Sequence, residues 1–356
     1  MLYTIIMKHD ENHSIALLTT GDEVVSGDII NRNASQIAKQ LDDHRFYVKT
    51  HLAVRDDQNT VVNAIQWLMK SHKVIITTGG LGPTLDDLTI DAISEATQLP
   101  VEFNPDAWAM VQRIYKDYGI SCPDNNKRLA RFIKGSTLFK PLNGTAHGSL
   151  IQTDQHIIIA LPGPPKECMP MVTRDLMPYL KTQALDNGLF RTTFYLFAAS
   201  ESHVASLVEP ECQKNNLSFG FRTSFPYLEV KVFTKEPNPK LDGIQEKVSP
   251  WFIGFKAIKY EHIFFDYYLK QFDAFKFNAN EQAKPLLAWL PGWHKQQGSI
   301  ELNVAYIDSE KTIEASYHGQ KASFTLNKNY SQERICLLAK AWLSMQWVQW
   351  LQIPLD

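Results

Sequence analysis

The chain has 356 residues, a length that predicts two or three domains, and its 44% hydrophobic content is sufficient for buried cores. The formal net charge of −2 provides no basic field, so nucleic acid is not an expected partner. The four cysteines include no C-x-x-C pair, which argues against a zinc knuckle or a disulfide framework and favours reduced thiols in a cytoplasmic protein. No apolar run reaches the roughly 18 residues of a membrane helix, and we interpret the opening MLYTIIM as a tail, not a signal peptide.

Strand and helix patterns alternate over the first 80 residues. Apolar, β-branched runs predict strands at 14–20 and 46–54. Helical spacing of apolar residues predicts one helix that begins near 31–33 and another over 57–71. This alternation predicts βαβ units with a mostly parallel sheet, whose ligands bind outside the carboxyl ends of the strands.

The segment from Val74 to Asp91, VIITTGGLGPTLDDLTID, carries the strongest local signal. Its apolar start predicts a buried parallel strand, and the three glycines within 79–82 permit backbone conformations that other residues resist. Thr84 and Asp87 form a capping box that predicts a helix opening at Thr84. A strand, a glycine turn and a helix N-terminus together are typical of a phosphate site. Neither the dinucleotide fingerprint G-x-G-x-x-G nor a P-loop is present here.

Two neighbouring carboxylates, Asp86 and Asp87, follow the glycine turn. Carboxylates repel phosphate unless a cation lies between them, so we predict a Mg²⁺-like site. Asp22 and Glu23 follow the first strand, and the shared carboxyl edge of parallel strands is expected to bring both acidic clusters to one cleft. The alternatives are that Asp87 is only a helix cap and that Asp22 and Glu23 only cap a loop.

The remainder of this region supplies a second strand, turn and helix that we expect on the other side of the cleft. The predicted segments are helices at 105–118 and 125–132, a glycine-rich loop at 143–148, a strand at 156–161 and a helix after Pro162 that runs to about Thr182. Lys127 and Lys166 are candidate counter-charges for phosphate, although lone lysines are usually solvated.

Several motifs occur in a fixed order between about 14 and 180. They are Thr20-Gly21-Asp22-Glu23, Gly27 with Asn33, Thr78 to Thr84 with Asp86 and Asp87, Asn125 with Lys127, Gly144-Thr145-Ala146 with Gly148, and Leu161 to Pro165 with Glu167. Together they resemble the CinA family (competence/damage-inducible protein A), whose first domain resembles the molybdopterin-binding domains of molybdenum-cofactor biosynthesis. Two departures are Asn31, where the family often has Asp, and His147, where it often has Pro. Loss of a carboxylate at 31 would weaken a metal contact.

The resemblance implies an α/β fold with a three-layer αβα, molybdopterin-binding-like domain and a mostly parallel sheet over 14–182. It also implies a small α+β middle domain over 190–254 and a degenerate α/β, deamidase-like domain over 255–356. A homodimer is implied, as is a divalent metal cofactor (Mg²⁺, Mn²⁺ or Co²⁺), with potassium as a further candidate. The implied substrate-binding residues are Thr78, Gly79, Gly80, Leu81, Gly82, Thr84, Asn33, Lys127, Gly144, Thr145, Gly163 and Lys166.

Beyond residue 180 the pattern predicts strands at 192–198, 217–222 and 227–234, with helices over 200–212 and 237–248. We expect this middle domain to serve packing and dimerisation. Arg222 is a candidate phosphate contact, and the alternative is a surface salt bridge. The last hundred residues resemble the closing half of the family's C-terminal domain, in segments at 286–291, 299–306, 322–326 and a helix over 331–351. Six of the eight tryptophans lie at or after Trp251, which predicts a packed core there.

The resemblance suggests hydrolysis of ADP-ribose, or a similar nucleoside diphosphate, to AMP and ribose 5-phosphate. Asp86, Asp87 and Asp22 would hold the metal, while Asp87 and Glu23 would serve catalysis. One alternative is a non-catalytic dimeric scaffold that binds a nucleotide or a pterin phosphate, and a weaker one is adenylylation of molybdopterin. The family's C-terminal domain deamidates nicotinamide mononucleotide through a Glu-Ser-Cys-Thr-Gly-Gly-like segment. No such segment occurs between Gly254 and Gly298, so we expect no deamidase activity.

Overall fold

The computed structural model describes residues 14–183, 189–237, 239–257, 260–270, 275–291, 293–294, 298–326 and 329–353. The opening tail predicted from MLYTIIM lies outside these residues. The chain divides into two compact units, one that ends at Phe190 and one that begins at Arg191, and each is treated by itself below. Within the described residues, no helix is both long enough and apolar enough to cross a membrane.

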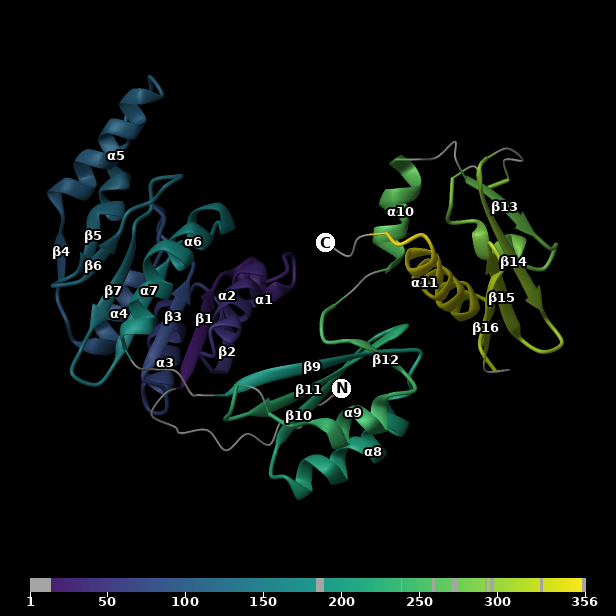
Figure 1. Ribbon diagram of the computed structural model, residues 1–356. Helices are drawn as coiled ribbons and strands as arrows, with labels where there is room; N and C mark the ends of the chain where they lie inside the picture. The colour runs from purple at the N-terminus through teal and green to yellow at the C-terminus, as the bar shows by residue number, and fades with distance from the viewer. Residues whose placement is uncertain are drawn as a thin grey trace. The chain divides into compact units, whose positions relative to one another are not determined.

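A six-stranded sheet forms the centre of the N-terminal unit, in the order β2-β1-β3-β8-β7-β6 (Figure 1). Strands β2, β1, β3 and β8 run parallel, and β7 and β6 continue the sheet antiparallel. Their bounds are β1 Ile15–Thr20, β2 Val48–Val54, β3 Val74–Thr78, β6 Thr137–Phe139, β7 Gly148–Gln152 and β8 Ile157–Leu161. The expected α/β fold with a mostly parallel sheet is confirmed, although the sequence did not indicate β6 and β7.

Helices cover both faces of this sheet, because its central strands are apolar on both sides. Ile76 and Ile159 pack with α2, α6 and α7 on one face. Ile75 and Ile158 pack with α3 and α4 on the other face, and all four side chains are fully buried. Each contributes about 1.5–3 kcal/mol relative to an exposed position. The bounds are α2 Arg32–Asp43, α3 Gln58–Met69, α4 Thr89–Thr97, α6 Pro165–Met171 and α7 Met177–Thr182.

Short polar side chains begin three helices of this unit. Asn31, Asp57 and Asn104 cap α2, α3 and α5 (Pro105–Asp117), each accepting a hydrogen bond from the N–H three residues on, at 3.1, 2.8 and 2.9 Å. Such a bond satisfies one of the free N–H groups of a helix start and is worth about 1 kcal/mol. The helices predicted to begin near 31–33 and to span 57–71 and 105–118 are confirmed.

The helix predicted to open at Thr84 begins instead at Thr89, so this prediction of its start is wrong. Thr84 donates its N–H at 2.8 Å and its hydroxyl at 2.6 Å to Asp87 Oδ2. These bonds close a local turn, because the hydroxyl donates to the carboxylate and does not accept from an amide of a first helical turn. Leu85, which helical spacing groups with the apolar face, is 85% exposed.

Three other segments of the N-terminal unit differ from the predicted elements. The helix expected over 125–132 is a 3-10 helix, η2 (Asp124–Ala130), followed by β5 (Arg131–Ile133), which pairs with β4 (Val101–Phe103). A five-residue helix, α1 (Asp22–Ser26), holds the first acidic cluster. The helix expected to run to about Thr182 does so, with a π-helical turn at Val172–Leu176 between α6 and α7.

The C-terminal unit contains two four-stranded sheets, each packed against two helices. The first has the order β10-β11-β9-β12 and packs against α8 and α9 (Figure 1). Its elements are β9 Phe190–Phe197, α8 Glu201–Lys214, β10 Ser218–Ser224, β11 Tyr227–Thr234, α9 Asp242–Val248 and β12 Phe252–Gly254. The predicted strands and the helix predicted over 200–212 are confirmed. The helix predicted over 237–248 begins only at Asp242, and the sequence did not indicate β12. Arg222 pairs with Glu229 at 2.8 Å, so the structure favours the salt-bridge interpretation of this side chain.

The second sheet has the order β13-β14-β15-β16 and packs against α10 and α11. Its elements are α10 Tyr260–Lys270, β13 Phe275–Ala279, η5 Lys284–Leu287, β14 Ile300–Ile307, β15 Thr312–Tyr317, β16 Gln320–Thr325 and α11 Gln332–Trp350. Trp342 and Trp347 are at most 4% exposed, which confirms the core predicted from the tryptophans. The sequence did not indicate α10, β13 or β15.

Candidate functional site

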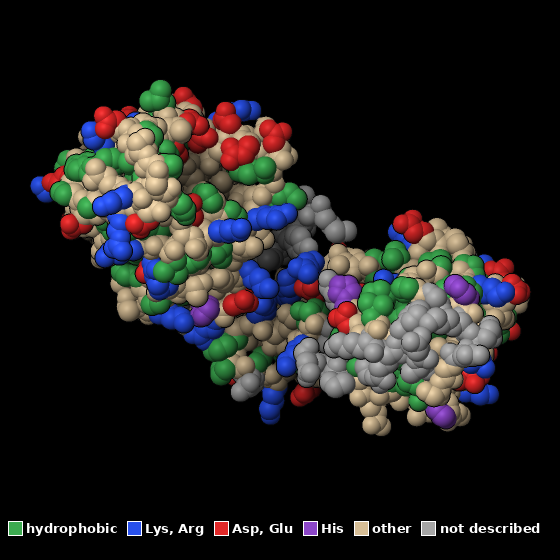
Figure 2. All heavy atoms as spheres, turned by 90° about the horizontal axis from the view of Figure 1, so that it is seen from above, with side chains coloured by type: hydrophobic (Ala, Val, Ile, Leu, Met, Phe, Trp, Pro, Cys, Tyr) green, Lys and Arg blue, Asp and Glu red, His purple; other side chains and the backbone are tan. Residues whose placement is uncertain are grey.

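A cavity of about 910 Å³ lies at the carboxyl ends of β1, β3 and β8. Figure 2 shows acidic side chains gathered around a hollow in the N-terminal unit. The lining includes the residues that directly follow each strand, namely Gly21 after β1, Gly79 after β3 and Pro162 after β8. Its volume lies within the range of about 300–1,000 Å³ typical of small-molecule sites. The cavity therefore occupies the edge of the sheet that the sequence predicts.

The glycine turn at 79–82 forms one wall of this cavity. Gly79 has φ +105° and Gly80 has φ +63°, and a Cβ at either would collide with Thr20 or Thr89. Only glycine permits both the backbone conformation and this close approach. Among the described residues, the amides of Gly80, Leu81 and Gly82 have no hydrogen-bond acceptor, whereas Gly79 N–H donates to the Leu161 carbonyl at 3.1 Å. Three of the predicted phosphate-binding amides are thus free to bind an anion.

The acidic turn that follows brings Asp86 and Asp87 to the same wall. Asp87 Oδ2 binds Thr84, and its carboxylate lies 2.5 Å from where a Cβ of Gly82 would be placed. The hydroxyl of Thr84 holds the pKa of Asp86 below its ordinary value. Both carboxylates line the same cavity as the free amides, and that of Asp87 lies beside Gly82, so they disfavour a bare phosphate and favour one accompanied by a cation.

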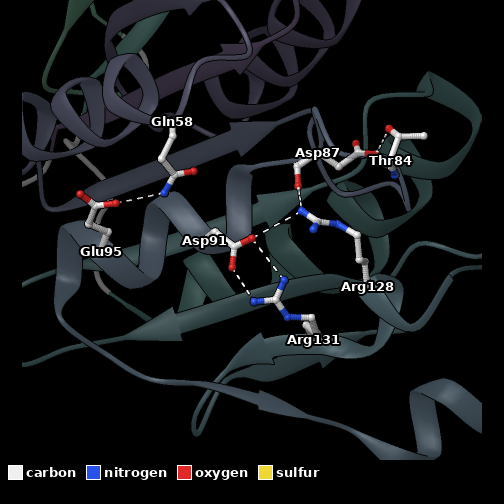
Figure 3. Close-up of polar contacts among 7 residues, drawn as sticks. All are labelled: Gln58, Thr84, Asp87, Asp91, Glu95, Arg128 and Arg131. Atoms are coloured by element: carbon white, nitrogen blue, oxygen red, sulfur yellow. Dashed lines mark hydrogen bonds and ion pairs between the residues drawn. The ribbon is translucent and has the colours of Figure 1, made fainter. Parts of the chain in front are cut away.

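An arginine from η2 holds the acidic turn in place, and a second arginine, from β5, binds only the helix that follows the turn (Figure 3). Arg128 Nη2 donates to the Asp87 backbone carbonyl at 2.8 Å and lies 3.5 Å from Asp91 Oδ2. Arg131 binds the Asp91 carboxylate with two nitrogens, at 3.2 and 2.6 Å. Because Asp91 belongs to α4, this network ties the turn to both the helix and the η2 segment.

A second group of carboxylates lies at the ends of β1 and β2. Glu23 and Asp56 line the cavity, and Asp56 Oδ2 accepts the Asp22 N–H at 3.1 Å. Burial raises the pKa of Asp56, and the charges of Glu23, Asp22 and Asp86 raise it further, against the lowering effect of the Asp22 amide. Because Glu23 and Asp56 line the same cavity as Asp86 and Asp87, the two acidic clusters meet at one site. Asp22 itself turns to Arg55, 3.6 Å away, and is not part of the lining.

The cavity suits a hard cation such as Mg²⁺, because its lining offers carboxylate oxygens as metal ligands and, in the part of the chain that the structure describes, includes no His or Cys side chain. Within the described residues, no group of three His, Cys, Asp or Glu side chains is arranged to hold a metal alone. Mg²⁺ commonly uses one or two carboxylates together with water and the phosphates of its ligand. Asp86 and Asp87 fit that kind of shared site.

Comparison with known proteins shows what the N-terminal unit is similar to. A family model described as "Probable molybdopterin binding domain" matches residues 16–182. A competence-damage inducible protein of Thermoanaerobacter pseudethanolicus is 30% identical over 235 residues, which cover 65% of this chain and 57% of the relative. A CinA-like protein of Geotalea uraniireducens is 30% identical over 236 residues, which cover 66% of this chain and 54% of the relative. The N-terminal unit therefore carries a molybdopterin-binding-like domain, and its sequence is similar to those of CinA-like proteins.

The chain spans about half the length of the curated relatives it matches. Among solved structures, one similar protein is CinA of Thermoplasma acidophilum, whose title gives its function as unknown. It is 25% identical at a TM-score of 0.44, and the match covers 48% of this chain and 99% of that one. MoaB of Pyrococcus furiosus, titled a tungsten cofactor synthesizing protein, is 17% identical at a TM-score of 0.31, with 48% of this chain covering 95% of that one.

The CinA-like domain brings most of the predicted site residues into one cavity. Those in the lining are Glu23, Asn33, Thr78, Gly79, Gly80, Leu81, Gly82, Asp86, Asp87, Thr145 and Gly163. Those outside the lining are Asp22, Thr84, Lys127, Gly144 and Lys166. Lys127 pairs with Asp124 at 3.0 Å on the surface, so its charge is partly neutralised away from the cavity. Gly144 instead makes room for the carboxylate of Glu167.

The two asparagines at the start of α2 have different roles. Asn31, one of the departures from the family pattern, accepts from Ala34 N and donates to Thr19 Oγ1 at 2.9 Å. Its Oδ1 therefore caps α2 and its Nδ2 ties the helix start to β1, and an Asp could not donate the second bond. Asn33 is 8% exposed and donates to the Gly163 carbonyl at 2.6 Å, while its Oδ1 has no partner among the described residues.

Two residues of the CinA-like domain, Asp56 and Glu167, extend the predicted set, whereas His147 lies outside the cavity lining. Asp56 follows β2 just as Asp22 follows β1. Its position at the carboxyl end of a parallel strand, where ligands bind, could have identified it from the sequence. Glu167 lines the cavity, and burial raises the pKa of its carboxyl despite a hydrogen bond from the Ala146 amide. His147, the second departure from the family pattern, is 5% exposed, and burial lowers its pKa to about 4. It is therefore neutral near pH 7 and contributes no charge to the site.

Proposed function

We propose that the CinA-like domain is a divalent-metal-dependent pyrophosphohydrolase that cleaves ADP-ribose, or a similar nucleoside diphosphate compound, to AMP and ribose 5-phosphate. The observation that carries this proposal is the set of free amides at Gly80, Leu81 and Gly82 beside the carboxylates of Asp86 and Asp87. Backbone amides favour a diphosphate and carboxylates favour a cation, so this wall suits the two bound together.

Hydrolysis requires that a water oxygen bond to one phosphorus while the bond from that phosphorus to the bridging oxygen breaks. The bridging oxygen leaves with the other phosphate, and the proton of the water must be accepted nearby. A metal held by Asp86 and Asp87 would neutralise phosphate charge and lower the pKa of a bound water. Glu23, which lines the cavity, is the group we propose to orient or deprotonate the water.

The test is release of AMP from ADP-ribose with Mg²⁺, Mn²⁺ or Co²⁺, and with the metal removed by EDTA. We expect metal-dependent turnover in the wild type and its loss in Asp87→Ala and in Asp86→Asn, with circular dichroism showing retained folding. Asp124→Ala is the control, because Asp124 is an exposed acid outside the cavity lining. Absence of turnover with every metal contradicts the catalytic claim, and nucleotide binding without turnover supports the scaffold alternative.

Two further expectations concern the rest of the chain. Without the Glu-Ser-Cys-Thr-Gly-Gly-like segment between Gly254 and Gly298, we propose that the chain does not deamidate nicotinamide mononucleotide. Formation of the acid at a rate that scales with protein concentration would contradict this. We also propose a homodimer, which sedimentation equilibrium would test directly through the mass in solution.

A further inference from the structure

The charges around the cavity are strongly unbalanced. Six acidic side chains line it, namely Glu23, Asp28, Asp56, Asp86, Asp87 and Glu167. Among the described residues of the lining, Arg32 is the one positively charged side chain. Because Arg32 pairs with none of these carboxylates, its charge is available to an anionic ligand.

Arg32 is the first residue of α2, directly after the cap Asn31, and is exposed. Its guanidinium has no hydrogen bond or ion pair among the described residues. Helix α2 packs on the face of the sheet opposite to α4, which follows the glycine turn. Arg32 and the free amides of Gly80 to Gly82 therefore approach the cavity from different layers of the domain.

A second observation at the same helix start also points to a ligand. Asn33 lines the cavity and is 8% exposed, and its Oδ1 has no donor among the described residues. The 2.6 Å bond from its Nδ2 to the Gly163 carbonyl fixes the orientation of the amide, so the bare atom is an acceptor. A buried acceptor left without a donor costs about 1–3 kcal/mol, so a ligand group that donated to it would stabilise this wall of the cavity.

We propose that Arg32 binds the diphosphate of the ligand from the α2 wall, while the amides of Gly80 to Gly82 bind it from the β3 wall. This inference rests on the ligand class of the proposed function. It transfers to Arg32 the counter-charge role that the sequence assigned to Lys127 and Lys166, neither of which lines the cavity. The planar guanidinium suits this role, because it can donate two parallel bonds to one phosphate.

The experiment is calorimetric titration of the full chain with ADP in the presence of Mg²⁺, and with adenosine as the uncharged probe. We expect Arg32→Ala to weaken ADP binding about tenfold or more and to leave adenosine binding within twofold. Arg32→Lys should recover part of the loss, since it restores the charge without the fork of donors. Lys127→Ala and Lys166→Ala are the matched controls and should bind ADP within twofold of the wild type.

The same titrations separate this inference from the proposed activity, because they do not depend on turnover. ADP binding that depends on Arg32 in a protein without hydrolysis supports the inference and contradicts the activity. Hydrolysis of ADP-ribose with equal ADP affinity in the wild type and Arg32→Ala overturns the inference alone. A wild type that does not bind ADP overturns it as well, as does an equal loss of affinity in Lys127→Ala or Lys166→Ala.

Discussion

Replacement of Gly80 by alanine tests whether the glycine turn is held by close packing or only by its backbone conformation. Gly80 has φ +63°, and a Cβ there would collide with Thr89 Oγ1, which donates to the Gly79 carbonyl at 2.8 Å. The left-handed conformation costs alanine about 1–2 kcal/mol. Displacement of the buried hydroxyl removes a hydrogen bond worth about 0.5–1.5 kcal/mol. We expect Gly80→Ala to lower the free energy of unfolding by about 2–3 kcal/mol.

Gly135 provides the matched control, because it has φ +78° and no atom lies within 4 Å of its added Cβ. Gly135→Ala carries the same conformational cost, so urea unfolding of both variants isolates the collision with Thr89. The expected difference is roughly 1 kcal/mol, which a shift of the urea midpoint at constant slope would measure. Equal losses in the two variants would refute the close approach of Thr89 to the turn.

Two further predictions concern the surroundings of the turn. Arg128→Ala removes the donor to the Asp87 carbonyl, so we expect the Mg²⁺ concentration for half-maximal ADP binding to rise several-fold, whereas Arg131→Ala should leave it unchanged. Equal effects in both variants would contradict the positioning role of Arg128. His147 has a folded pKa of about 4, below its ordinary 6.5, so the unfolded chain binds its proton first as the pH falls. The stability that its neutral form provides is therefore complete above pH 6.5 and is lost towards pH 4, by roughly 3 kcal/mol. In His147→Gln the free energy of unfolding, measured with urea, should depend less steeply on pH across this range. The same dependence in the variant and the wild type would contradict the lowered pKa of His147.

Features encoded by neighbouring residues were predictable from the sequence. The apolar strands and the cap residues Asn31 and Asp57 act within one turn of chain, and their elements form where expected. The glycine turn was equally clear, because glycine readily adopts positive φ angles such as those of Gly79 and Gly80.

The sequence did not predict which partner a polar side chain binds when several are within reach. The Thr84 hydroxyl donates to Asp87 and does not cap an amide, which moves the start of α4 to Thr89. Lys127 could pair with a ligand or with a nearby acid, and in the structure it pairs with Asp124 three residues away. Arg32 became a candidate only once the lining of the cavity was known, because nothing in its local sequence distinguishes it from a solvated residue.

Thermodynamic linkage between metal and nucleotide tests most directly whether a cation joins the acidic turn to a diphosphate. The dissociation constant of ADP should be measured with saturating Mg²⁺ and with EDTA, in the wild type and in Asp86→Asn. We predict that Mg²⁺ tightens binding at least tenfold in the wild type and much less in the variant. Equal affinity with and without the metal in the wild type would contradict the account.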